Sequence, residues 1–437
     1  MTAISENRAK KPRIEIDADR CNGCIVCMKA CPTKAIRIRE GLARIEGVCI
    51  NCCECMRTCP RNAISASGFQ DEDLCGGDRV VVSPSTVIYS QFGPDCLPND
   101  ILLALRKMGF GYVHDQSYTS ELFNFAVELY IKDHRKKGDT HFPLISPACP
   151  VVVNLIAYRF PSLLKHLPPL ATPREIVTRE AKKRISTKYG YKPEEVRVLN
   201  ITPCPAMTEF IKESVYRKYA HADKAVGINR IYEDIHKNLR EIEDDRVFHH
   251  SSGIGLSWGM SGGEIAGLDR NCLAVSGLDE TIQYLEKIEM GLLNDLDYVE
   301  CRICREGCIG GPFTVADKYR AKHLLQKFAK MFGTEKRIKK KYVVDLYKKG
   351  WFFTEKDRSL YVSGDSERSI AENIERLNRV KRIVEALPRK ECGMCGCPDC
   401  ETFAGDVIDG KCNLRDCIFL RDRPKILTQL KSEIRNP

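Results

Sequence analysis

The stretch ECRICREGCIGG, residues 300–311, carries Cys304 and Cys308 beside three glycines. Two further cysteines stand alone in short proline-containing motifs, Cys149 in SPACP and Cys204 in TPCPA. In this chain of 437 residues and 23 cysteines, such scattered thiols predict a metal site assembled from distant segments. The alternative is that the four cysteines serve only as small apolar residues of a core.

Two of these cysteines follow predicted strands. Residues 144–146 form an apolar run before Cys149, and residues 196–201 form another before Cys204. Further strands are predicted at 80–82 and 112–114, and helices at 98–108 and 120–133. Alternating strands and helices predict an α/β domain with a mostly parallel sheet. Open sheets of this kind place their sites just beyond the strand ends, where these cysteines lie.

An internal repeat near the N-terminus carries the pattern C-x2-C-x2-C-x3-C-P twice. The two runs are Cys21, Cys24, Cys27, Cys31 and Cys49, Cys52, Cys55, Cys59. In bacterial two-cluster ferredoxins the fourth cysteine of each run binds the other cluster. One 4Fe–4S cluster would then take Cys21, Cys24, Cys27 and Cys59, and the other Cys49, Cys52, Cys55 and Cys31. Zinc is the weaker alternative, and Cys53 lies outside the pattern.

A third cysteine group lies near the C-terminus and consists of Cys392, Cys395, Cys400 and Cys417. Its spacing predicts one more 4Fe–4S cluster, with zinc as the alternative. The motif resembles the cluster domain of electron-transport subunits such as the B subunit of Rnf complexes.

Composition narrows the class of protein. The chain is 43% hydrophobic and 29% charged, with a net charge of +10. It shows no secretory signal, no membrane span and no nucleic-acid-reading motif. Closely spaced cysteines in such a chain favour the reducing cytoplasm over disulfides. Basic runs such as 336–341 are either a solvated helix face or a docking surface for an acidic ferredoxin-like partner.

The chain from about residue 79 to 318 resembles the H-cluster domain of FeFe hydrogenases. That family carries the motifs TSCCP, MPCxxK and ExMxCxxGCxxGG, which here read SPACP, TPCPAM and ECRICREGCIGG. The resemblance implies that Cys149, Cys204, Cys304 and Cys308 hold a 4Fe–4S cluster. It also implies that Cys308 bridges to a two-iron subcluster that carries CO, cyanide and an azadithiolate.

Several residues depart from the family pattern at this site. Ala148 stands where the family has its proton-relaying cysteine, and Thr202 and Arg302 stand where two methionines shield the two-iron unit. Met207 replaces a lysine that anchors a cyanide ligand. A buried charge-assisted contact of that kind contributes about 1.5–3 kcal/mol, so its loss weakens the case for the two-iron unit.

A neighbouring thiol offers a substitute proton relay. Cys301 lies three residues before Cys304, and a thiol relays protons if its surroundings lower its pKa. The alternative is that Cys301 is a packing residue. Thr172 stands where the family has a relay serine, and the predicted helix 120–133 carries Glu121 but no paired glutamates at residues 126 and 127.

We therefore predict four parts: a two-cluster α+β ferredoxin domain (1–76), an α/β H-cluster-type domain with mostly parallel sheets (77–318), a charged helical connector (319–386) and a C-terminal helical 4Fe–4S domain (387–437). This order resembles sensory-type FeFe hydrogenases. It implies a hydrogenase-type oxidoreductase that slowly interconverts H2 and protons, with Cys308 and Cys301 as catalytic residues and Ala148, Met207, Thr202 and Arg302 against the cofactor.

The expected cofactors are three accessory 4Fe–4S clusters and one in the H-cluster-type domain, with the two-iron subcluster left open. The expected partners are a ferredoxin-like redox protein or a signalling protein, and a homodimer is left open. The alternative function is an iron–sulfur electron-transfer or scaffold protein with 4Fe–4S clusters alone. A small-molecule reductase with a remodelled site is a third, weaker alternative.

Overall fold

The computed structural model describes residues 14–66, 77–138, 141–212, 224–240, 246–354, 369–421 and 423–435. The chain divides into two compact units, one formed by residues 1–67 with 362–437 and the other by residues 68–361. Residue 76, where the predicted ferredoxin domain ends, lies outside the described residues. The domain boundaries therefore stay predictions.

The N-terminal part of the first unit repeats one strand–helix–strand pattern. Its elements are β1 (Ile14–Ile16), α1 (Val26–Ala30), β2 (Ile36–Arg39), β3 (Leu42–Ile45), α2 (Glu54–Thr58) and β4 (Ile64–Ala66). Strand β1 pairs antiparallel with β4, and β2 pairs antiparallel with β3. Its small core contains Met28 and Ile36 but also several of the cysteines. A core this small depends on bound metal for much of its stability.

The C-terminal part of the first unit is helical. It consists of α14 (Ile370–Ala386), α15 (Cys400–Ile408), the 3₁₀ turn η8 (Leu414–Asp416) and α16 (Pro424–Arg435). Helix α14 packs on both α15 and α16. Phe403 and Leu420 are fully buried between them, so this part has an apolar core of its own.

Two parallel sheets form the centre of the second unit, which confirms the predicted fold class. The larger sheet has the order β6-β5-β8-β9 and the smaller has the order β10-β11-β7. Their strands are β5 (Gly77–Pro84), β6 (Phe110–Val113), β7 (Leu144–Ile145), β8 (Arg197–Thr202), β9 (Lys224–Gly227), β10 (Cys272–Ser276) and β11 (Tyr298–Arg302). All five pairings among these strands are parallel.

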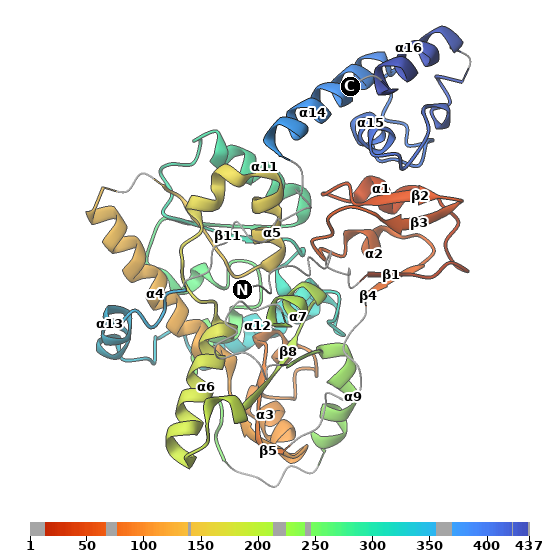
Figure 1. The fold of residues 1–437 in the computed structure, drawn as a ribbon. Coiled ribbons are helices and arrows are strands. Elements are labelled where there is room, and N and C mark those ends of the chain that lie inside the picture. The colour runs from red at the N-terminus through yellow and green to blue at the C-terminus, as the bar shows by residue number, and fades with distance from the viewer. Residues whose placement is uncertain are drawn as a thin grey trace. The chain divides into compact units, whose positions relative to one another are not determined.

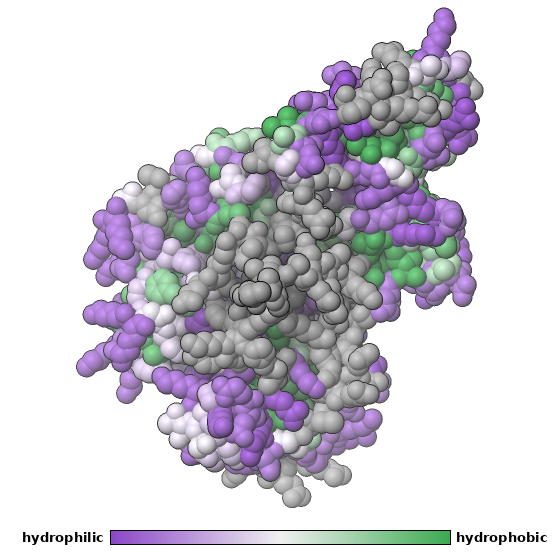
Figure 2. Space-filling view, viewed as in Figure 1, coloured by the Kyte–Doolittle hydropathy of each residue, from purple (hydrophilic) through white to green (hydrophobic). Residues whose placement is uncertain are grey.

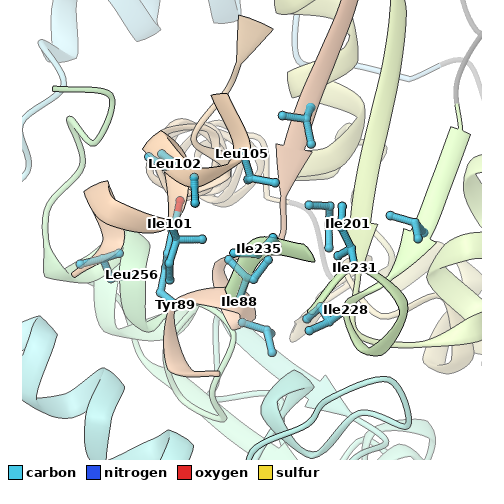
Figure 3. Close-up of a cluster of buried hydrophobic side chains, with 14 of the residues drawn as sticks. Ile88, Tyr89, Ile101, Leu102, Leu105, Ile201, Ile228, Ile231, Ile235 and Leu256 are labelled. Carbon is cyan, nitrogen blue, oxygen red and sulfur yellow. The ribbon is translucent and has the colours of Figure 1, made fainter. Parts of the chain in front are cut away.

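Helices surround these sheets (Figure 1). They are α3 (Pro98–Lys107), α4 (Gln116–Lys136), α5 (Pro150–Arg159), α6 (Pro173–Tyr189), α7 (Pro205–Lys212), α9 (Ile228–Asn238), α10 (Gly253–Ser257) and α11 (Leu278–Glu289). Figure 3 shows the main core, where Ile88 and Tyr89 meet Leu102, Ile201 and Ile231 from separate elements. Burial of this apolar surface is the main force that holds the larger sheet and its helices together.

The predicted connector is shared between the two units. Helix α12 (Lys318–Phe332) buries Leu325 and Phe328 in the main core of the second unit. Helix α13 (Lys340–Lys348) and the fully buried Phe352 join another core cluster of that unit. The segment is charged, as predicted, but its apolar residues recur at helical spacing and pack inward.

The described helices include none with enough length and apolar character to cross a membrane.

The side chains visible over α6 are mainly hydrophilic or near neutral in Figure 2. That helix exposes Lys183 and Arg184, in keeping with a helix that turns one face to water.

Candidate metal centres

The first ferredoxin-type site is a cavity lined by Cys21, Cys24, Cys27 and Cys59. Burial and the charges of the three other thiols raise the pKa of Cys27 to about 11. Ile25, at the start of α1, adopts a left-handed conformation with φ of 61°. This sharp turn brings the closely spaced cysteines of the first run to one side of the loop. The fourth cysteine in the cavity, Cys59, comes from the second run, and its role as a cluster ligand stays a prediction.

The second ferredoxin-type site brings together Cys31, Cys49, Cys52 and Cys55. Cys31 and Cys49 both act electrostatically on Cys52 and Cys55, and burial is the largest cause of the raised pKa of both. Backbone N–H groups point at the thiols, with Ala35 N 3.2 Å from Cys31 Sγ. Such donors stabilise the thiolate form that binds metal. Cys53 instead donates to Asn51 O at 3.6 Å.

The C-terminal site is a cavity with Cys392, Cys395, Cys400 and Cys417 in its wall. Cys395 acts electrostatically on both Cys400 and Cys417, which places these thiols close together. Cys397 also lines the cavity, but its thiol contacts Asp406 Oδ2 at 3.3 Å. The four thiols therefore lie in one cavity, and Cys397 contacts Cys395 of this set as well as Asp406.

The four scattered thiols of the second unit also meet. Cys149 precedes α5, Cys204 precedes α7, and Cys304 and Cys308 follow β11. Burial is the largest cause of the raised pKa of Cys204, and the charges of the other three thiols add to it. Cys308 likewise interacts with Cys149 and Cys304. The site lies beyond the carboxyl ends of β8 and β11, which belong to different sheets.

Two buried arginines flank these four thiols. Arg174 is 7% exposed and Arg302 is 1% exposed. Arg174 interacts electrostatically with Cys149, Cys204 and Cys308, and Arg302 interacts with Cys149 and Cys308. Arg174 lies at the start of α6, where its Nη1 donates to Ala148 O at 3.3 Å. Two positive charges thus face one cluster of thiols.

These guanidinium groups leave buried N–H donors unused. Arg174 Nε and Nη2 and Arg302 Nη1 find no hydrogen-bond acceptor within the described part of the chain. Burial lowers the pKa of Arg174, because the cation loses its hydration. Buried donors without acceptors are costly. An iron–sulfur cube on four thiolates carries net negative charge and accepts hydrogen bonds at its sulfurs, so this donor set fits an anionic cluster.

A network of acidic residues holds Arg302 in place. Arg302 Nη2 lies 2.5 Å from Glu264 Oε2, and its Nε lies 3.3 Å from Glu300 Oε1. Ser146 and Tyr298 donate to Glu264 at 2.9 and 2.6 Å. Burial raises the pKa of Glu300 to about 7. The guanidinium also stacks over Trp258 at 4.6 Å, which fixes it further.

The other residues singled out in the sequence lie around this site. Ala148 is fully buried, and Met207 is 5% exposed; the backbone N–H of Met207 donates to Cys204. The Thr202 hydroxyl lies 2.8 Å from that of Thr208. The Thr172 hydroxyl donates to Glu175 at 3.1 Å. The hydroxyl of Thr172, the candidate relay residue, is therefore already engaged with Glu175.

Cys301 lies on β11 and is fully buried. Burial is the largest cause of its raised pKa, and Cys149 and Glu300 add to the shift. A relay thiol needs the opposite shift, so the structure favours the packing alternative. Glu121 is buried as well and accepts hydrogen bonds from Ser251 and Ser252, each at 2.6 Å.

Sequence reasoning missed three residues that shape the site: Arg174, Glu264 and Glu300. Glu300 begins the motif ECRICREGCIGG, and Glu264 ends the short stretch SGGE at residues 261–264. Their role as partners of a buried arginine depends on tertiary contacts. Arg174 carried one usable signal: it follows Pro173 in ATPREIV, at a position where a helix begins.

Comparison with known proteins supports the same three modules. Residues 78–271 match the family model "Iron only hydrogenase large subunit, C-terminal domain". Residues 14–37 match a 4Fe–4S binding domain, and residues 387–419 match an Fe–S cluster model. Residues 78–271 are thus similar to FeFe hydrogenases, and the chain also carries a ferredoxin-type match and an extra cluster-type match.

Curated relatives are hydrogenases of low identity. The periplasmic Fe hydrogenase large subunit of Nitratidesulfovibrio vulgaris is 26% identical over 280 residues, which is 57% of this chain and 65% of that protein. Iron hydrogenase 1 of Clostridium pasteurianum is 22% identical over 269 residues, which is 50% of this chain and 46% of that protein. The chain therefore spans about half to two thirds of the length of these relatives.

Solved structures show the same fold for the second unit. Two variants of the FeFe-hydrogenase HydA1 of Chlamydomonas reinhardtii match with TM-scores of 0.50 and 0.51 at 13% identity. The matches cover 65% and 66% of this chain and 92% and 95% of those chains. At this identity the likeness concerns the fold alone.

Proposed function

We propose that this FeFe-hydrogenase-like chain is a slow hydrogenase-type oxidoreductase that acts as a hydrogen or redox sensor. One observation carries the proposal: four thiols from three separate segments meet beside two buried arginines with unused N–H groups. When bound, a two-iron group supplies the making and breaking of the H–H bond. The protein supplies ligation, burial and charge.

In this proposal each residue of the site has a defined part. Cys149, Cys204, Cys304 and Cys308 hold the cube, and Cys308 also reaches the two-iron group. Arg174 and Arg302 would supply N–H donors and positive charge to the anionic ligands of that group, the part that the resemblance gives to a lysine where this chain has Met207. Their unused donors are Nε and Nη2 of Arg174 and Nη1 of Arg302.

The slow rate follows from the proton route. Ala148 offers neither a donor nor an acceptor on its side chain, and the raised pKa of Cys301 disfavours loss of its proton. Efficient proton transfer requires a group whose pKa lies near the working pH. A sensor needs only to bind its ligand and to change the redox state of its clusters. An enzyme of high turnover must also move protons rapidly to and from the site.

We place the chain in the cytoplasm, with a ferredoxin-like protein or a signalling protein as its partner. The described cysteines are free thiols, which suits a reducing compartment where disulfides are rare. The net charge of +10 suits an acidic redox partner, because opposite charge speeds encounter.

A second function is favoured by Met207, which is buried and carries no charge where the family has its lysine. The chain would then hold 4Fe–4S clusters alone and act in electron transfer or as a scaffold. Four cubes contain about sixteen irons, whereas the two-iron group brings the total to about eighteen. Iron and acid-labile sulfide counts on the matured full chain discriminate between the two.

Hydrogen uptake by the anaerobically matured chain, measured with a viologen acceptor, tests the primary proposal. We expect slow uptake that is lost in Cys308→Ala and kept in Cys272→Ala. Cys272 is the control because the charges that act on it come from carboxylates and Arg270, and not from the thiols of the site. Uptake equal in wild type and Cys308→Ala would refute the assignment of the site.

A further inference from the structure

The loop that carries the C-terminal cysteines lies directly against the ferredoxin-type part of the first unit. Ile38 N on β2 donates to Gly396 O at 2.8 Å. Strand β2 pairs with β3 on one side only. Gly396 therefore satisfies a backbone donor at the open edge of a two-stranded sheet.

Two glycines of the C-terminal motif are required by this approach. A Cβ on Gly396 would lie 2.1 Å from Ile38 O, and one on Gly393 would lie 3.0 Å from Met28 Cε. Both glycines adopt φ of +78°. Gly393 lies between Cys392 and Cys395, and Gly396 follows Cys395. The ligand loop of one site thus touches the residue after Cys27, a thiol of the first ferredoxin-type site.

A buried ion cluster holds the two parts together. Asp406 on α15 accepts from Arg37 Nη2 at 3.1 Å and from Arg39 Nη2 at 2.7 Å. Arg37 and Asp406 are 6% and 4% exposed. Burial alone would raise the pKa of Asp406, but the hydrogen bond and charge of Arg37 outweigh it and lower the pKa. Removal of one partner from such a buried set is strongly destabilising.

Two lysines extend the contact. Lys29 Nζ donates to the backbone oxygens of Glu391 and Pro398, the latter at 2.6 Å. Lys34 Nζ lies 2.6 Å from Asp399 Oδ2. Every one of these contacts joins residues 28–39 to residues 391–406, so one face of the ferredoxin-type part is used throughout.

The contact joins two candidate cluster sites by a short path. Ile38 is part of the wall of the cavity with Cys21, Cys24, Cys27 and Cys59. Its N–H bonds to Gly396, whose neighbour Cys395 lines the C-terminal cavity. Cys27 of the first site in turn acts on Cys55 of the second. The three sites therefore follow in the order C-terminal, first and second.

We infer that the C-terminal cluster and the first ferredoxin-type cluster exchange single electrons across the Ile38–Gly396 contact. In each step one reduced cluster loses one electron and the neighbouring oxidised cluster gains it, with no bond broken and no proton moved. The inference requires only the iron–sulfur clusters of the first unit. It is therefore independent of the proposed hydrogen chemistry in the second unit.

Electron paramagnetic resonance of the reconstituted, fully reduced full chain tests this inference. Two reduced clusters in contact split or broaden each other's signals. The first and second ferredoxin-type clusters already interact in this way, because Cys27 of one site acts on Cys55 of the other. We expect an additional interaction between the C-terminal and first clusters in wild type, and the loss of this additional part alone in Cys417→Ala, which removes the C-terminal cluster. Gly396→Ala introduces a clash with Ile38 O and should weaken the additional interaction several-fold at unchanged iron content.

Gly410→Ala is the matched control, because Gly410 has φ of +71° and an added Cβ there would have no atom of the described residues within 4 Å. It imposes the same backbone strain without the clash and should keep the interaction. Asp406→Asn gives a second disruption if Gly396→Ala loses iron. The inference is wrong if reduced wild type shows no interaction beyond the one that Cys417→Ala retains, or if the additional interaction keeps its full strength in both disrupted variants.

Discussion

Arg302 Nη2 lies 2.5 Å from Glu264 Oε2, and both side chains are buried, at 1% and 0% exposure. Arg302 thus stands in the site together with its own counter-ions, Glu264 and Glu300. The site therefore contains a buried ion network in addition to its differences from the family motifs.

Arg302→Met should destabilise the chain by about 3–5 kcal/mol, because Glu264 and Glu300 would be left buried without their cation. Denaturant unfolding of the second unit measures this loss. Arg305→Met, an exposed neighbour, should change stability by less than about 0.5 kcal/mol. Equal stability of the two variants would show that the network contributes nothing.

Arg174→Met should lower the midpoint potential of the four-thiol cluster by an amount on the order of tens of millivolts, because a nearby positive charge favours the reduced form. A potentiometric titration followed by electron paramagnetic resonance gives this value. Arg184→Met removes the same charge from an exposed position of α6 and should leave the potential unchanged. The same shift in both variants would remove Arg174 from the site.

Glu300 predicts a pH dependence of that potential. Burial raises the pKa of Glu300 to about 7, so the carboxyl group is neutral below that pH and negative above it. Added negative charge disfavours reduction, and the potential should therefore fall as pH rises past about 7. In Glu300→Gln this change should vanish. A wild-type potential that is constant between pH 6 and 8 would contradict the assignment.

Cys301 and Cys204 should behave differently when replaced by alanine. Cys204→Ala should lose the iron of one cluster, about four atoms, whereas Cys301→Ala should keep all of it. If Cys301 is a packing residue, its alanine variant keeps the wild-type rate of hydrogen turnover and loses about 1 kcal/mol of stability. A fall in turnover at full iron content would instead establish the relay.

Local spacing indicated which thiols lie near one another in the ferredoxin-type and C-terminal parts, and their role as metal ligands stays a prediction. Short runs such as Cys392–Cys400 bring thiols together within a single loop. Residues that are close in the sequence are then also close in space. The strands before Cys149 and Cys204 were predictable for a similar reason, since apolar runs such as 196–201 mark buried strands.

The rest depended on contacts between distant segments. The pairing of Arg302 with Glu264 joins residues 38 positions apart, and that of Arg37 with Asp406 joins residues 369 positions apart. A sequence marks such residues as charged but gives no sign that they are buried. The same limit applies to Gly396, whose need for a bare backbone arises from Ile38 O.

The infrared spectrum of the chain after maturation with the two-iron cofactor tests the central claim most directly. Bound CO and cyanide absorb in a region free of protein bands. We predict both sets of bands in wild type, their loss in Cys308→Ala and a shift of the cyanide bands in Arg174→Met. A fully iron-loaded chain without such bands would contradict the account and leave a carrier of 4Fe–4S clusters.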